Sequence, residues 1–275
     1  RLEIKSTNAQ MDGGLIMSKR AVMALSGGMD STSLLLRLLR EGYTVTSISY
    51  LYGQKHSIEI VRATENIRRL QSNGLKVKHK IIDLSSAMNS FHSALTDDDF
   101  DIPEGHYEEE QMKQTVVPNR NAIFSSILYG MGLSISQLED TDVVIALGVH
   151  SGDHAIYPDC RPEFYNALSI AFGIGNWDSD RVVFELPYLE GDKTTILEDA
   201  LYSCEILNLD FDTIMGSTIT SYNPDNNGRS SGRSGSDIER IIAFHDIGRV
   251  DPIEYVDSWD TVLENALKLK EARGA

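Results

Sequence analysis

The 275-residue sequence carries 41 acidic and 25 basic side chains, a formal net charge of −16, and its apolar and charged fractions of 41% and 24% are ordinary for a globular protein. Because the negative charge repels phosphate backbones and no stripe of Lys and Arg with interleaved aromatic residues is present, nucleic acid is disfavoured as a direct partner. No run of about 20 apolar residues and no secretory signal is found, so we expect a cytoplasmic protein without membrane helices. The two cysteines, Cys160 and Cys204, exclude a disulfide framework and a four-cysteine zinc site.

Residues 1–16 are polar, and we interpret them as an N-terminal extension or a cloning remnant that precedes a native start at Met17. We expect residues 17–275 to form one domain that ends in a C-terminal loop and helix. Short apolar, β-prone runs then alternate with helical patterns, and the candidate strands are residues 21–25, 44–50, 77–83, 142–147 and 182–186. The alternation predicts a Rossmann-like α/β fold with a mostly parallel sheet and helices on both faces.

The first helix is predicted from Ser31 to a left-handed cap at Gly42, with its leucines in the core. Further helices are predicted at residues 57–70, 121–133, 163–172, 194–207 and 259–273. The acidic stretch 96–111 is interpreted as a mobile surface loop that could act as a lid. The Asn-, Gly- and Ser-rich stretch 221–237 is interpreted as a long loop.

Residues 26–31 read Ser-Gly-Gly-Met-Asp-Ser and lie where the first strand ends and the first helix begins. Backbone N–H groups and the helix dipole attract anions at such a junction, and glycines let the backbone approach closely. Ser26 and Ser31 can donate to phosphate oxygens, but the Lys of a Walker A loop is absent. The alternative is a glycine-rich turn without a ligand.

This hexad resembles the PP-loop of the N-type ATP pyrophosphatases, whose fold is adenine nucleotide alpha hydrolase-like. The resemblance implies that ATP is cleaved between its α- and β-phosphates, that the substrate is adenylated, and that Mg²⁺ assists. The ATP-binding residues it implies are Leu25, Ser26, Gly27, Gly28, Met29, Asp30, Ser31 and Tyr50. Asp30 is either a helix N-terminal charge or a magnesium contact.

Three further segments narrow the resemblance to one family. Residues 52–56 read Tyr-Gly-Gln-Lys-His, residues 117–121 Val-Pro-Asn-Arg-Asn, and residues 157–164 Tyr-Pro-Asp-Cys-Arg-Pro-Glu-Phe. Together they resemble the 7-cyano-7-deazaguanine synthases, the QueC family, over residues 20–244. The resemblance implies a carbon–nitrogen ligase of queuosine biosynthesis that adenylates 7-carboxy-7-deazaguanine, forms the amide with ammonia, and dehydrates it to the nitrile with a second ATP.

The same resemblance implies which residues act. Arg120 and Lys193 are candidate electrostatic clamps on the carboxylate and phosphates and are catalytic together with Asp30, although each cation could instead form a structural ion pair. The substrate-binding candidates are Tyr52, Gln54, Arg120, Asn121, Tyr157, Asp159, Arg161 and Glu163, with Asp159 and Glu163 as acceptors for the donor edge of the base. His150 and Asp153 follow a strand and either touch substrate or form a turn. Catalysis by Cys160 is disfavoured because adenylation needs no thiol.

The C-terminal part departs from the family, whose members carry a cysteine zinc site there. Ser221, Ser231, Ser234 and Asp237 occupy the corresponding positions. Hydroxyls are poor zinc ligands, so we predict no bound zinc and expect Ser and Asp hydrogen bonds or a partner chain to hold this loop.

Because the cysteines of the family's zinc site are replaced, the sequence leaves the identity of the nitrogen acceptor open. Ammonia is one candidate, and an amine of a partner protein is the other, as in QueC-like proteins of antiphage (CBASS-type) defence systems. A non-catalytic nucleotide-binding subunit and a sulfur-inserting tRNA enzyme are weaker hypotheses. A homodimer is left open, and the helix that begins at Trp259 is either its surface or plain core.

Overall fold

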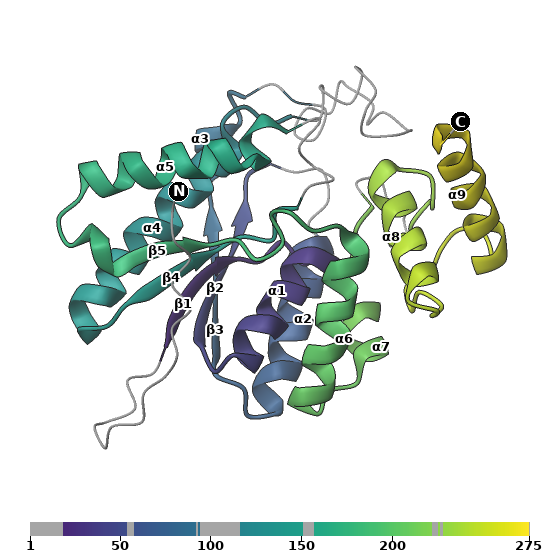
Figure 1. The fold of residues 1–275 in the computed structure, drawn as a ribbon, viewed down its shortest axis with the longest axis horizontal. Coiled ribbons are helices and arrows are strands. Elements are labelled where there is room, and N and C mark those ends of the chain that lie inside the picture. The colour runs from purple at the N-terminus through teal and green to yellow at the C-terminus, as the bar shows by residue number, and fades with distance from the viewer. Residues whose placement is uncertain are drawn as a thin grey trace.

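A computed structural model of the chain describes residues 19–53, 58–91, 93, 116–150, 157–221, 225 and 228–274. Five parallel strands form one sheet in the order β3-β2-β1-β4-β5 (Figure 1). They are β1 (Arg20–Ala24), β2 (Thr44–Leu51), β3 (Val77–Asp83), β4 (Val143–Ala146) and β5 (Val182–Glu185). In register, Arg20 of β1 lies beside Thr44 on one side and Val143 on the other. The strand order reverses between β1 and β4, and such a switch point is where open α/β sheets bind ligands.

Helices cover both faces of the sheet (Figure 1), which explains why the middle strands are nearly continuous apolar runs. One face carries α1 (Met29–Arg40), α2 (Ile58–Ser72), α6 (Lys193–Leu207) and α7 (Phe211–Gly216), and the other carries α4 (Arg120–Glu139) and α5 (Pro162–Gly175). The short helices α3 (Ser85–Met88), η3 (Pro158–Cys160) and η4 (Ser179–Arg181) join these elements. Leu34, Leu35 and Leu38 of α1 are fully buried, because α1 lies between the sheet and α6.

The last two helices, α8 (Gly235–Asp246) and α9 (Trp259–Gly274), lie beside the end of α6 and build a smaller apolar cluster (Figure 1). A fully buried ion pair joins α8 to the segment before α9, with Arg240 Nε 2.6 Å from Asp251 Oδ2. Arg240 also donates to Thr218 Oγ1 at 2.7 Å, and Tyr255 donates to Asp251 at 2.8 Å. These partners satisfy a charge pair that would otherwise be costly to bury.

The predicted Rossmann-like α/β class is confirmed, and each predicted strand matches an observed one to within about a residue at either end. Gly42 follows α1 with φ of +84°, as a left-handed cap requires. The prediction for 221–237 was wrong at its end, because α8 begins at Gly235. The prediction also missed the helices α3, α7 and α8. The extension 1–16 and the acidic stretch 96–111 lie outside the described residues.

Two parts of the surface, at α9 and at the end of α5, are relevant to the predicted homodimer. Trp259 packs partly buried against the core, and Val262 and Ala266 of α9 are buried, so this helix packs within the chain. In contrast, Ile174 of α5 and the nearby Trp177 are 84% and 90% exposed. The homodimer stays a prediction. Within the described ranges, no helix combines the length and the apolar character needed to cross a membrane.

Candidate active site

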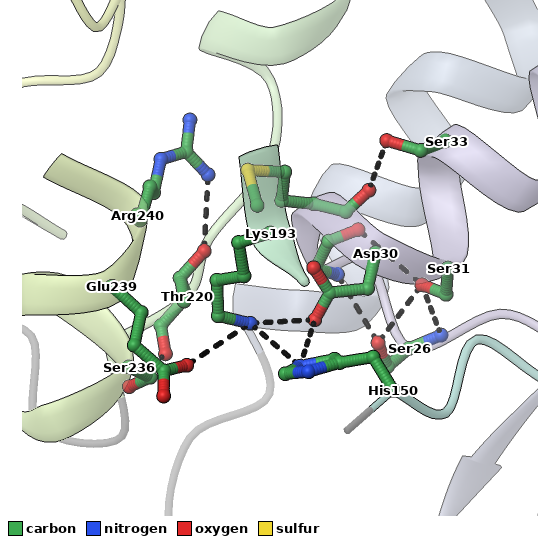
Figure 2. Close-up of polar contacts among 12 residues, drawn as sticks. Ser26, Asp30, Ser31, Ser33, His150, Lys193, Thr220, Ser236, Glu239 and Arg240 are labelled. Carbon is green, nitrogen blue, oxygen red and sulfur yellow. Dashed lines mark hydrogen bonds and ion pairs between the residues drawn. The ribbon is translucent and has the colours of Figure 1, made fainter. Parts of the chain in front are cut away.

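The turn between β1 and α1 is shaped as a cradle for an anion. Gly27 has φ of +92°, and a Cβ built on it would lie 2.1 Å from the backbone oxygen of Glu59 in α2, so no other residue fits without a shift. The hydroxyls of Ser26 and Ser31 lie 3.0 Å apart, and Ser26 Oγ accepts from the Gly28 N–H at 3.2 Å (Figure 2). The turn therefore presents two hydroxyls and the N-terminus of a twelve-residue helix to one point.

A buried cluster of charged side chains stands beside this turn (Figure 2). Lys193, the first residue of α6, places its Nζ 2.8 Å from Asp30 Oδ2 and 3.1 Å from His150 Nε2. Glu239 of α8 lies at 3.9 Å from the same Nζ. The Asp192 carboxylate caps α6 by accepting from the Thr195 N–H at 2.8 Å, which fixes the helix end that carries Lys193. Three separate parts of the chain thus converge on the ammonium group that α6 carries.

This cluster sets the protonation of Asp30. Burial raises the pKa of Asp30, but the charges of Lys193 and His150 and the hydrogen bond from Lys193 outweigh burial, so its pKa lies below the usual value. Asp30 is therefore ionised at neutral pH. Its Oδ1 is buried and has no hydrogen-bond partner within the described part of the chain.

Aromatic and charged side chains from β2, α2 and α4 form the other wall. Tyr50 stacks on Phe124 at a centroid distance of 4.0 Å and donates to the Phe124 carbonyl at 3.1 Å. Burial raises the pKa of Tyr52, while the charge and hydrogen bond of Arg120 oppose this. Burial also raises the pKa of Glu59 to about 7, against the opposing charge of Arg120.

The two walls enclose one pocket at the carboxyl ends of β1, β2 and β4, the switch point of the sheet. Its cavity measures about 220 Å³, and the wider space that opens to solvent measures about 1190 Å³. The predicted site residues that line it are Leu25, Ser26, Gly28, Met29, Asp30, Ser31, Tyr50, Tyr52, Arg120, Asn121 and Lys193. Gly27 lies behind the turn, against α2.

The predicted substrate-binding residues in the octad 157–164 do not line this pocket. Tyr157 is buried in the core, and Asp159 Oδ2 accepts from the Asn121 N–H at 3.2 Å. Arg161 and Glu163 are exposed at the start of α5 and do not line this pocket, whereas Cys160 does. Gln54 and Asp153 lie outside the described residues. The roles of these octad residues stay predictions.

Two acidic residues of the site, Glu59 in the pocket wall and Glu239 beside Lys193, are absent from the predicted site residues. Glu59 was overlooked because it belongs to no motif and reads as an ordinary first-turn acid of a helix. Glu239 was overlooked because no helix was predicted between residue 237 and Trp259, whereas α8 spans Gly235–Asp246. A capping signal, Ser234 followed three residues later by Asp237, would have predicted that helix.

Side chains at the predicted zinc-ligand positions form a hydrogen-bonded cluster. Ser234 and Asp237 cap α8 reciprocally, and Asp237 also accepts from Ser230 at 2.6 Å and from Ser231 at 3.4 Å. Burial raises the pKa of Asp237, although the serine hydrogen bonds oppose it. Ser221 is buried. Among the described residues, no group of three or more His, Cys, Asp or Glu side chains is arranged to hold a metal ion.

Known proteins resemble the chain along most of its length. The model of the family described as queuosine biosynthesis protein QueC matches residues 20–248. 7-Cyano-7-deazaguanine synthases from Alteromonas mediterranea and Methanoregula boonei are each 41% identical, covering 87% and 86% of this chain and 100% and 99% of their own. The solved structure of NMN synthetase from Francisella tularensis is 15% identical with a TM-score of 0.39, and the match covers 93% of this chain and 85% of that one.

Proposed function

Because this chain belongs to the QueC family of queuosine biosynthesis proteins, we propose that it is an ATP-dependent carbon–nitrogen ligase that adenylates the carboxylate of 7-carboxy-7-deazaguanine. Nitrogen then displaces AMP and gives the amide or the nitrile. The observation that carries this proposal is the single pocket in which the β1–α1 turn faces Arg120. The wall formed by the β1–α1 turn has the groups that bind phosphate, and the wall that carries Arg120 has the charge that binds a carboxylate. The reaction forms a bond between these two ligands.

At the phosphate wall, the N–H groups at the start of α1 and the hydroxyls of Ser26 and Ser31 hold the β- and γ-phosphates. Lys193 stabilises the negative charge that grows on pyrophosphate as the α–β bond breaks, and Asp192 and Asp30 fix its direction. Mg²⁺ supplies further neutralisation of that charge when bound. The residues fit it, because Asp30 keeps one buried carboxylate oxygen that has no hydrogen-bond partner among the described residues.

At the opposite wall, Arg120 orients the substrate carboxylate toward the α-phosphate. A carboxylate is a weak electrophile until its oxygen belongs to an AMP leaving group, so alignment of the two reactants is the main requirement. Tyr52 is hydrogen-bonded to Arg120 and restricts where its guanidinium points. The Tyr50–Phe124 pair offers a flat apolar surface against which a planar base packs.

Mass spectrometry of the products tests this proposal. The protein is mixed with ATP, Mg²⁺, 7-carboxy-7-deazaguanine and ammonium, and AMP, amide and nitrile are quantified against controls without each component. AMP release that depends on the acid, together with amide or nitrile, is expected. ATP binding without AMP formation would contradict the proposal and favour a non-catalytic nucleotide-binding subunit.

A second acceptor is favoured by the C-terminal region, where serines and Asp237 stand at the family's zinc-ligand positions. In this alternative, the activated deazaguanine is joined to an amine of a partner protein in antiphage defence. AMP formation without nitrile would direct the search to proteins encoded nearby. A mass increase by one acylated deazaguanine on a co-expressed partner would establish this acceptor, and an unchanged partner mass would exclude that protein.

A further inference from the structure

Glu59 stands where three parts of the pocket wall meet. It is the second residue of α2, and its backbone oxygen packs against Gly27 of the phosphate-binding turn. Its side chain interacts electrostatically with Arg120 at the start of α4 and with Tyr52 after β2. Glu59 therefore lines the pocket next to both the β1–α1 turn and Arg120.

Two carboxyl side chains line the described pocket, and their environments differ. Asp30 stays ionised because it forms an ion pair with Lys193 at 2.8 Å. Burial raises the pKa of Glu59 to about 7, because the charge of Arg120 offsets only part of the desolvation. At neutral pH Glu59 thus exists in both protonation states, as a group that exchanges protons requires.

The nitrogen-transfer step of the proposed function needs a proton acceptor. An ammonium ion must lose one proton before it can attack, and the nitrogen sheds another after the bond forms. We propose that Glu59 is the general base of this step, an inference that rests on the proposed function. The nitrogen lone pair bonds to the carbonyl carbon, the C–O bond to AMP breaks with its electrons leaving on AMP, and the nitrogen proton passes to the Glu59 carboxylate and then to solvent.

The test separates adenylation from nitrogen transfer. Exchange of labelled pyrophosphate into ATP, dependent on the deazaguanine acid, reports adenylation, and amide formation with ammonium reports the second step. Glu59→Gln keeps the size and polarity of the side chain but cannot accept the proton. We expect exchange within about threefold of wild type and amide formation about 10²–10⁴-fold slower.

The pH profile gives a readout that a structural role would not move. At a constant concentration of free ammonia, wild-type amide formation rises with pH through about 7 and then levels, because the ionised base is the active form. Glu59→Gln loses this rise, and Glu59→Asp, which keeps a carboxylate, recovers part of it. Glu65→Gln makes the same charge change on the surface of α2, where Glu65 pairs with Arg62, and should behave as wild type.

Three results would overturn the inference. Wild-type amide formation by Glu59→Gln shows that another group takes the proton. Exchange that falls as far as amide formation shows that Glu59 supports binding or folding. Absence of exchange in the wild-type protein refutes the proposed function itself, and the role of Glu59 then falls with it.

Discussion

Replacing Gly27 by Ala tests whether the turn between β1 and α1 is held in place by α2. The new Cβ would lie 2.1 Å from the Glu59 backbone oxygen, and φ is +92°. Gly42→Ala is a matched control, because Gly42 has φ of +84° and nothing lies within 4 Å of its added Cβ. The two substitutions share the backbone strain and differ in the collision.

The strain term follows from the left-handed conformation. An L-residue there costs about 1–2 kcal/mol, and reduced freedom of the unfolded chain returns about 0.4–1 kcal/mol. Gly42→Ala should therefore lower the free energy of unfolding by about 0–1.6 kcal/mol. Overpacking adds about 1–3 kcal/mol at Gly27, for a total of about 1–4.6 kcal/mol.

Urea unfolding measures both costs, and calorimetric titration with ATP measures the effect on the pocket. Because relief of the collision must move the turn or the first turn of α2, Gly27→Ala should weaken ATP binding at least tenfold and Gly42→Ala should leave it unchanged. Equal unfolding free energies and equal ATP affinities for the two variants would show that α2 yields freely, and the rigid-turn reasoning would be refuted.

Three more predictions follow from single contacts. Lys193→Met should lower pyrophosphate exchange more than 100-fold and leave the Asp30 carboxylate without its buried partner, costing about 3 kcal/mol in urea unfolding; retained exchange would remove Lys193 from the mechanism. Asp237→Ala should cost about 1–3 kcal/mol by removing a helix cap and two serine hydrogen bonds, whereas a zinc chelator should not shift the thermal midpoint of the wild type; a chelator-sensitive midpoint would contradict the zinc prediction. Burial raises the pKa of Asp199, but the hydrogen bonds from Tyr188 and Arg40 outweigh burial, so its pKa in the folded protein lies below 3.8. The stabilisation from this carboxylate is therefore present above pH 3.8 and is lost as the pH falls through the folded pKa. Asp199→Asn should flatten the acid side of the stability profile below about pH 4, and an unchanged slope would contradict this prediction.

The sheet could be predicted because each strand is a short apolar run and each crossover contains a helical pattern. Gly42 marked the end of α1 for the same local reason. The helix α8 was hidden by the Ser- and Gly-rich composition around residue 230, although Ser234 and Asp237 supply a capping signal. Local patterns therefore predicted elements well wherever composition and capping agreed.

The pocket was only partly predictable. The turn at Ser26–Ser31 could be predicted from its two glycines and from its position directly after a strand. The contact between Lys193 and Asp30 joins residues 163 positions apart, so no periodicity could reveal it, and only the family resemblance drew attention to Lys193. Glu59 carries no motif, and its altered pKa arises from burial by segments that the sequence does not show to be neighbours.

A late segment of the chain completes the turn between β1 and α1, which lies near the start of the fold. Ile219 donates its N–H to the Gly27 carbonyl at 3.1 Å, and Ile219, Thr220 and Ser236 line the pocket. Ribosomes add about 5–20 residues per second, so about 10–40 s separate synthesis of Gly27 from synthesis of Ser236. During that interval the growing chain lacks the segment that completes the wall of this pocket.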